Sequence, residues 1–519
     1  MQKNIPCKPL RTCILSVGVA LLSTYSSLIS AEKLVDSRLS QIETIIIIYA
    51  ENRSFDNLYG LFPGANGILK NADGTDTNLV NHRQLDRDGV SVLSTLPSVW
   101  SVQGTKTSDK LSFVTGLPNA PFKIDGAPGA APETLGMNTP TPDLVHRFYS
   151  NQKQINGGKN NMFAAWSDAG GLTMGYYDGT PMKMWQIARQ YTLADNFFMG
   201  AFGGSFLNHF WLICACTPTY RNAPEALISK VDENGTALMV DESSPRSALL
   251  GKPIYLADKP LTPDYYAVNT LQPPYQPSGI APHNNGDKTL ADTDKRPLPP
   301  QNSVTTKTIG DTLSAKGVNW AWYAGGWNEA SENREVIYNN KEINFQAHHQ
   351  PFNYFSRFNP ATEDGRKQRR LHLKDYTDLQ KDIQAGTLPS VVFYKPQGNL
   401  NQHPGYTDVM SGDEHIAELV ANLQKSRQWH KMAIIVTYDE NGGYWDHVPP
   451  PKGDRWGPGT RIPTIIISPY SKTNYVDHTY YDTTSILKLI TQRFSLESIP
   501  GVRAEAGNLS NVFVKQQPR

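Results

Sequence analysis

The chain reads MAIIVTYDENGGYWDH over residues 432–447. A β-branched apolar run that ends in acids, glycines and a histidine predicts a buried strand followed by a chemically active loop. In open α/β sheets, ligands bind at the carboxyl ends of the strands. Two adjacent carboxylates there cannot both be buried and ionised unless a cation lies between them. We therefore interpret Asp439 and Glu440 as metal ligands; the alternative is a solvated acidic turn.

A second segment is built in the same way. The apolar run TIIIIYA at residues 44–50 leads directly into ENRSFDN at residues 51–57. Glu51 and Asn52 thus place an oxygen-donor pair at the end of another predicted strand. Hard cations prefer carboxylate and amide oxygens, while Zn²⁺ also takes histidine. The alternative is that Asn52 forms a turn and Glu51 is a surface acid. Two such strand ends in one chain favour one bound divalent metal ion, either Mg²⁺, Ca²⁺, Mn²⁺ or Zn²⁺.

Length, charge and the N-terminus limit the class of protein. The 519 residues fit one large α/β domain with insertions, or two domains. A formal net charge of +1 gives no basis for nucleic-acid binding. Lys3, Lys8 and Arg11 precede a short apolar run at residues 14–22, which predicts a signal peptide over residues 1–31. We expect a bacterial protein that is periplasmic or secreted, with no integral membrane segment in the mature chain.

Apolar runs alternate with amphipathic segments, which is typical of an α/β fold with a largely parallel sheet. The predicted strands are Thr44–Ala50, Thr192–Phe198, Val318–Tyr323, Ser390–Tyr394, Met432–Tyr438 and Pro463–Ile467. The predicted helices are Pro181–Gln190, Thr306–Lys316, Asp413–Gln428 and Thr483–Phe494. Two stretches rich in Gly, Pro and polar residues, near 62–142 and 217–303, are interpreted as insertions and not as linkers between domains.

Cysteine use predicts no disulfide framework. Cys7 and Cys13 lie in the predicted signal peptide, and Cys214 and Cys216 are one residue apart. A disulfide at that spacing would be strained, and on a helix the two side chains point apart. We expect two buried thiols, with a redox site as the alternative.

Ser205 is the candidate nucleophile. It follows Gly203-Gly204 and precedes an apolar stretch that predicts a helix. The N-terminus of a helix collects unpaired N–H groups and holds anions, so a serine there is placed to attack phosphorus. The alternative is a serine that only caps the helix. The surrounding sequence is not Gly-x-Ser-x-Gly, which disfavours an α/β-hydrolase triad.

Several histidines lie in loops after predicted strands. They are His146, His348, His349, His403 and His447. Histidine can stabilise phosphate oxygens and protonate a leaving alkoxide near neutral pH. A hydrogen-bonded structural histidine is the alternative for each of them taken singly.

Together these residues resemble the bacterial phosphoesterase family, which joins phosphocholine-type phospholipases C to AcpA-type acid phosphatases. The motifs that carry the resemblance are ENRSFD at residues 51–56, the Gly-Gly-Ser turn at Ser205, His403-Pro404 and residues 438–447. The resemblance implies an alkaline-phosphatase-like fold. This is a three-layer α/β sandwich with a central, mostly parallel sheet and long loop or cap insertions, formed by residues 32–519 as one domain.

The resemblance also implies roles for individual residues. One metal ion is expected at Glu51, Asn52, Ser205, Asp439 and Glu440. The catalytic residues are expected to be Ser205, His146, His349 and His403. Substrate binding is assigned to His348, Asn208 and His447. The chain departs from the family at Phe206-Leu207-Asn208, where members often have a Thr-Pro stretch, and at Ala50, where phospholipases commonly have Gln or Met.

We therefore expect a metal-dependent acid phosphatase that acts on phosphomonoesters through a phosphoserine at Ser205. A histidine, His349 or His403, is expected to protonate the leaving group. Serine in place of threonine as the nucleophile favours this branch of the family. The alternatives are a phospholipase C that cleaves phosphocholine-type diesters and, from another class, an inactive secreted binding protein. The expected ligand is a small phosphate ester or a phospholipid head group.

Overall fold

The computed structural model describes residue 1 and residues 36–70, 82–99, 115–126, 136–337, 344–515. The predicted signal peptide, residues 1–31, lies outside the described residues apart from Met1. Among the helices that are described, none combines the length and the hydropathy needed to cross a bilayer.

An eight-stranded sheet forms the centre of the molecule, in the order β11-β4-β10-β9-β1-β8-β6-β7. Its strands are β1 (Thr44–Ala50), β4 (Thr192–Ala194), β6 (Trp320–Ala324), β7 (Leu373–Asp375), β8 (Val391–Lys395), β9 (Met432–Tyr438), β10 (Thr464–Ile467) and β11 (Tyr475–Asp477). β10 runs antiparallel to both of its neighbours, and the other pairs in the sheet are parallel. The predicted α/β fold with a mostly parallel sheet is confirmed.

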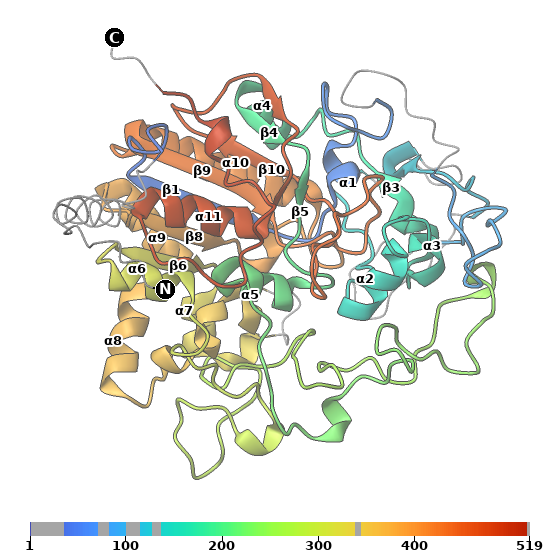
Figure 1. Ribbon diagram of the computed structural model, residues 1–519, viewed down its shortest axis with the longest axis horizontal. Helices are drawn as coiled ribbons and strands as arrows, with labels where there is room; N and C mark the ends of the chain where they lie inside the picture. The colour runs from blue at the N-terminus through green and yellow to red at the C-terminus, as the bar shows by residue number, and fades with distance from the viewer. Residues whose placement is uncertain (2–35, 71–81, 100–114, 127–135, 338–343, 516–519) are drawn as a thin grey trace.

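Helices lie on both sides of this sheet (Figure 1). The helices of the described residues are α1 (Phe55–Tyr59), α2 (Phe148–Ile155), α3 (Phe163–Trp166), α4 (Lys183–Gln190), α5 (Ser205–Cys214), α6 (Ile309–Ala315), α7 (Trp327–Glu332), α8 (Glu363–His372), α9 (Tyr376–Ala385), α10 (Val409–Lys425) and α11 (Thr483–Phe494), of which α2 and α3 lie beside the sheet and not over it. All four predicted helices are present, as α4, α6, α10 and α11. α11 has the predicted bounds, and Asp482 caps it by accepting a hydrogen bond from the Thr484 amide.

The predicted strand Thr192–Phe198 is interrupted. Residues Thr192–Ala194 join the central sheet as β4, whereas β5 (Phe197–Phe198) pairs with β12 (Tyr481–Asp482) in a separate ribbon. The change of partner occurs at Asp195, whose carboxylate accepts hydrogen bonds from the Asn66 amide and from His478. A further two-stranded ribbon is formed by β2 (Phe122–Lys123) and β3 (Gly175–Tyr176).

The three central strands set the position of the site. β1 is fully buried and pairs in parallel with β9 on one side and with β8 on the other. In this register Ala50 lies opposite Tyr438, so Glu51 and Asp439 leave the sheet side by side. Ile48 lies opposite Tyr394, which brings the end of β8 to the same edge. The sequence rule that ligands collect at the carboxyl ends of parallel strands therefore applies here.

The prediction of two buried thiols is wrong, because a disulfide joins Cys214 and Cys216. The prediction assumed helical geometry through both cysteines. Instead, α5 ends at Cys214, and Ala215 adopts a left-handed conformation with φ of 46°. This turn brings the two Cα atoms to 5.1 Å from each other, within the usual range for a disulfide.

Candidate active site

The loops after β1 and β9 are held against each other by backbone contacts. The amide of Asp439 donates to the carbonyl of Ala50 at 3.0 Å. The Asp439 carboxylate then accepts from the amides of Asn52 and Glu440 at 3.2 and 2.8 Å. Gly442 makes this approach possible, since a Cβ there would lie 2.2 Å from the Asn52 carbonyl oxygen. Its φ of 60° also favours glycine.

Ser205 stands at the first position of α5 and faces these two loops. Its Oγ lies 3.3 Å from Asn52 Oδ1 and 3.4 Å from Glu440 Oε1. The preceding glycines let the chain before α2 pass close by, because a Cβ on Gly204 would lie 2.7 Å from the His146 carbonyl oxygen. The predicted nucleophile, Asn52 and one of the paired acids therefore converge, as the sequence analysis expected.

The donor set around Ser205 suits one hard divalent cation. Asn52, Asp439 and Glu440 are fully buried and offer amide and carboxylate oxygens. Burial raises the pKa of Glu440 well above its usual range, and the negative charge of Asp439 adds to this rise against the influence of His146. Two adjacent acids that disfavour each other's ionisation are the electrostatic environment that a bound cation would relieve.

Glu51 is predicted to be a metal ligand, but in the structure its carboxylate is surrounded by protein donors. Oε1 lies 2.6 Å from His349 Nε2 and 2.8 Å from the ammonium nitrogen of Lys395. Oε2 accepts from Asn401 Nδ2 at 2.6 Å and from the Tyr406 hydroxyl at 2.9 Å. Direct ligation by Glu51 stays a prediction: Oε2 accepts two hydrogen bonds, whereas Oε1 lies beside two cationic or imidazole nitrogens but accepts no hydrogen bond from the described residues.

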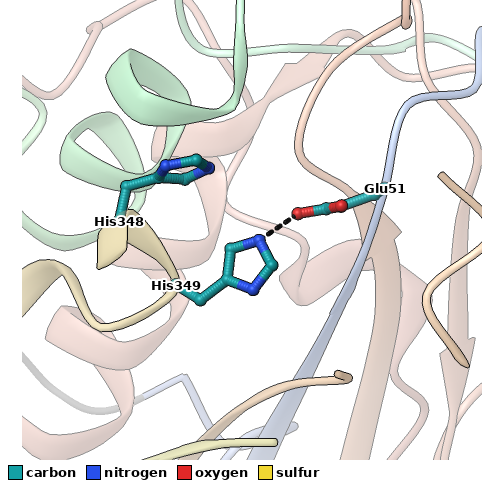
Figure 2. A group of neighbouring side chains, drawn as sticks. All are labelled: Glu51, His348 and His349. Atoms are coloured by element: carbon teal, nitrogen blue, oxygen red, sulfur yellow. Dashed lines mark ion pairs between the residues drawn. The ribbon is translucent and has the colours of Figure 1, made fainter. Parts of the chain in front are cut away.

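A second group of potential metal ligands lies at Glu51. Figure 2 shows His349 pointing at the Glu51 carboxylate with His348 beside it. One ligand atom from each of the three residues lies within 4.8 Å of the others. Burial and the charge of Lys395 lower the pKa of both imidazoles, although the charge of Glu51 opposes this. The Lys395 ammonium lies against Glu51 in this group, 2.8 Å from Oε1.

His146 and His403 lie on the other side of Asn52. Asn52 Nδ2 is 2.9 Å from His403 Nε2, and His403 Nδ1 is 2.5 Å from the Pro404 carbonyl oxygen. These contacts fit an imidazole whose Nδ1 donates to the carbonyl and whose Nε2 accepts from the Asn52 amide. His403 thereby turns the amide oxygen of Asn52 toward Ser205.

The charge of His146 is set by the acids that lie beside it. Its Nδ1 contacts the Leu144 carbonyl oxygen at 2.5 Å, and its Nε2 lies 3.7 Å from Glu440 Oε1. Burial alone would lower the pKa of His146, but the carboxylates of Glu440 and Asp143 outweigh burial and raise this pKa to about 9. His146 is therefore an imidazolium at neutral pH in the metal-free site.

A cavity of about 330 Å³ opens in front of Ser205. Of the predicted residues, Ser205, His146, His348 and His403 line it. Its walls also carry two acids, Asp143 and Asp168, and the pKa of Asp168 is raised by burial. Substrate can thus reach the serine hydroxyl and three of the predicted histidines.

Two predicted substrate-binding residues lie outside this cavity. Both ends of the Asn208 amide clamp the loop before α5, accepting from the Ala201 amide and donating to the carbonyls of Ala201 and Gly204. His447 pairs with Asp56, its Nδ1 lying 2.7 Å from the carboxylate. The structure thus gives Asn208 and His447 protein partners outside this cavity, and their role in substrate binding stays a prediction.

Sequence reasoning missed Lys395, Asn401, Tyr406 and His209. Lys395 ends β8 at the same sheet edge as Glu51 and Asp439, so the rule that found those acids applies to it too. Asn401 and Tyr406 lie in the loop around His403. His209 lies one turn after Ser205, with its Nδ1 2.7 Å from the Ser205 carbonyl oxygen. The helical spacing of four residues was the signal available for His209.

Comparison with known proteins identifies the family. The model of the Phosphoesterase family matches residues 42–497. The chain is 24% identical over 511 residues to phospholipase C B of Mycobacterium tuberculosis, which covers 92% of this chain and 78% of that protein. It is 26% identical over 251 residues to the non-hemolytic phospholipase C of Pseudomonas aeruginosa, covering 41% and 34% of the two chains.

Among solved structures, one that is similar is a protein in the alkaline phosphatase superfamily from Vibrio parahaemolyticus. It aligns at a TM-score of 0.32 and 9% identity, covering 66% of this chain and 65% of that one. The family model, by contrast, spans most of the chain and includes every loop that contributes to the site. The protein belongs to the phosphoesterase family.

Proposed function

We propose that this phosphoesterase hydrolyses phosphoric esters with Ser205 as the nucleophile and one divalent cation beside it. The observation that carries the proposal is the position of Ser205 Oγ, 3.3 Å from Asn52 Oδ1 and 3.4 Å from Glu440 Oε1 at the N-terminus of α5. A cation held by Asn52, Asp439 and Glu440 would lower the pKa of the hydroxyl and neutralise charge on the phosphoryl oxygens.

The chain's own residues account for the remaining steps. Ser205 Oγ attacks phosphorus in line, the bond to the leaving alkoxide breaks, and a phosphoserine forms. The free amides at the start of α5 stabilise the charge on the equatorial oxygens. We assign protonation of the leaving group to His146, because it lines the cavity with Ser205, whereas His349 is paired with Glu51 and His403 contacts Asn52. Water then attacks the phosphoserine and releases the phosphate product.

The proposed substrate is a phosphodiester of the phospholipase C type. Its support is the similarity to phospholipases C, which extends over 92% of the chain for one of them. The acids Asp143 and Asp168 on the cavity wall suit a head group that carries a positive charge. This revises the expectation of an acid phosphatase in favour of the alternative given with it.

A phosphomonoester is the second candidate, and one observation favours it. Among the described residues that line the cavity, Phe206 is the one aromatic side chain other than histidine. An aromatic cage for a quaternary ammonium, as choline recognition commonly uses, is therefore not formed by these residues.

The test compares p-nitrophenylphosphorylcholine with p-nitrophenyl phosphate, each with and without a chelator. The diester proposal expects chelator-sensitive turnover of the first substrate, and a drop in its kcat/KM of about tenfold in Asp143→Asn. Turnover of p-nitrophenyl phosphate alone would move the assignment to the monoester. Chelator-resistant activity on both would contradict the metal-dependent mechanism.

A further inference from the structure

Lys395 is a buried cation held between two of the site's carboxylates. Its side chain is fully buried, and its Nζ lies 2.8 Å from Glu51 Oε1 and 3.4 Å from Asp439 Oδ2. The ring of Tyr49 lies beneath the ammonium, with its centroid 5.3 Å away. Lys395 is the last residue of β8, Glu51 follows β1 and Asp439 follows β9. Three neighbouring strand ends therefore place one fixed positive charge between two negative ones.

A simple structural ion pair does not account for this placement. Taking a lysine and two carboxylates out of water costs several kcal/mol per ion, which a buried pair repays only with excellent geometry. The 3.4 Å contact to Asp439 is long for a charge-assisted hydrogen bond. Glu51 in addition has three other partners, including His349 at 2.6 Å. The Glu51 carboxylate and the His349 imidazole are groups of the kind that bind divalent metal ions.

The charges at the site give a second, independent argument. Glu51, Asp439 and Glu440 are three buried carboxylates, and the Lys395 ammonium cancels one of their charges. His146 Nε2 lies 3.7 Å from Glu440 Oε1, so Lys395 is the cation that faces Glu51 and Asp439. Without Lys395, the uncancelled charge of Glu51 and the neighbouring ligand atoms of Glu51, His348 and His349 would together favour a further divalent ion.

We propose that Lys395 is a built-in cation that takes the place of a second metal ion and restricts the site to a single divalent cation beside Ser205. The proposal deepens the single-metal hydrolase proposed above and rests on it. Lys395 acts through Glu51 and Asp439, so it is a positioning residue. Replacing it with a neutral side chain should convert the Glu51–His348–His349 group into a second metal site.

The test measures metal stoichiometry and not turnover alone. Purified metal-free protein is equilibrated with Mn²⁺ and its bound metal is determined by mass spectrometry. We expect about one equivalent in the wild type and in Lys395→Arg, and about two in Lys395→Gln. Lys431→Gln is the matched control, because this lysine pairs with Glu43 at 2.6 Å on the exposed surface. It should stay at one equivalent.

A double variant tests the identity of the second site. Lys395→Gln combined with Glu51→Gln removes a ligand along with the ammonium, so its stoichiometry should return to about one. Electron paramagnetic resonance gives a further readout, since two Mn²⁺ ions in one site produce a spin-coupled spectrum that a single ion does not.

The possible outcomes separate this inference from the proposed function. No bound metal in the wild type would contradict the metal-dependent hydrolase, and with it the role of Lys395. Two equivalents in the wild type, or one in folded Lys395→Gln, would overturn the role of Lys395 alone. If Lys395→Gln is unstable without metal, its melting temperature is followed across a Mn²⁺ titration. A second saturable rise that the wild type lacks supports the proposal, and its absence contradicts it.

Discussion

Ser205 Oγ lies 3.3 Å from Asn52 Oδ1, although the two residues are 153 positions apart in the chain. Asn52 follows the central strand β1, and Ser205 begins a helix that packs on α11. His403 Nε2 lies 2.9 Å from Asn52 Nδ2, and this contact orients the amide so that its oxygen faces the serine. Ser205, Asn52 and His403 thus form one connected group of side chains.

Removing the hydroxyl of Ser205 should abolish turnover without disturbing the fold. We expect Ser205→Ala to lower kcat by a factor of about 10³ or more, because no alternative nucleophile takes over the covalent step. Its melting temperature should stay within about 2 °C of the wild type, since the Oγ contacts at 3.3 and 3.4 Å are long. Ser40→Ala, at an exposed serine, is the control. Wild-type activity in Ser205→Ala would refute the assignment.

Gly442→Ala should disturb the metal site through Asn52. The added Cβ would lie 2.2 Å from the Asn52 carbonyl oxygen, so the loop must shift. We expect metal affinity to fall by roughly 10- to 100-fold, measured by calorimetric titration. Gly317→Ala is the matched control, because Gly317 has a similar left-handed backbone with φ of 72° but no neighbour within 4 Å. Equal losses in both variants would show that backbone strain alone is responsible.

The two histidines His146 and His447 should respond differently to the same substitution. His146→Asn should reduce kcat by about 10²-fold, because His146 lines the cavity and carries the proton. His447→Asn should leave kcat within about threefold and lower the free energy of unfolding by about 1–3 kcal/mol, because it loses the imidazole contact with the buried Asp56 carboxylate. Steady-state kinetics and urea unfolding measure the two effects. A large loss of kcat in His447→Asn would restore the predicted substrate-binding role.

Stability should fall in mild acid because of His415 on α10. Burial lowers the pKa of this imidazole from 6.5 to about 4. Its Nε2 lies 2.7 Å from the Tyr394 hydroxyl. The folded protein therefore binds fewer protons than the unfolded chain between these values, and stability is lost as the pH falls from 6.5 toward about 4. The loss attributable to His415 should reach at most about 3 kcal/mol.

Unfolding in urea across this pH range, in the wild type and in His415→Gln, measures that contribution. The variant has no group that titrates here, so its pH dependence should be shallower. Parallel curves for the two proteins would exclude His415 as the source.

The elements that carry the site could be predicted because their sequence signals are local. An apolar β-branched run that ends in oxygen donors identified β1 and β9, and Gly-Gly-Ser identified the start of α5. The donor pairs meet because these strands pair in parallel, which the spacing of helices and strands already indicated. Periodicity was therefore enough to find the sheet edge on which Ser205 and Asn52 converge.

Other parts depend on tertiary contacts that a single sequence does not display. The disulfide at Cys214 forms because Ala215 leaves the helix, and nothing in the local residues marks that turn. His447 has the composition of a site residue, yet Asp56 from a distant loop holds it. Glu440 faces the serine, and Lys395 pairs with Glu51. Side-chain packing at the sheet edge decides between these acids.

The pairing of Ala50 with Tyr438 has one further consequence, for folding. The functional acids follow these last paired residues with no intervening spacer, and side chains alternate between the two faces of a sheet. A slip of a single residue between β1 and β9 would turn Glu51 and Asp439 to opposite faces. Ligand affinity can therefore arise only when the two strands are aligned correctly, so Mn²⁺ uptake during refolding reports when the centre of the molecule has reached its native alignment.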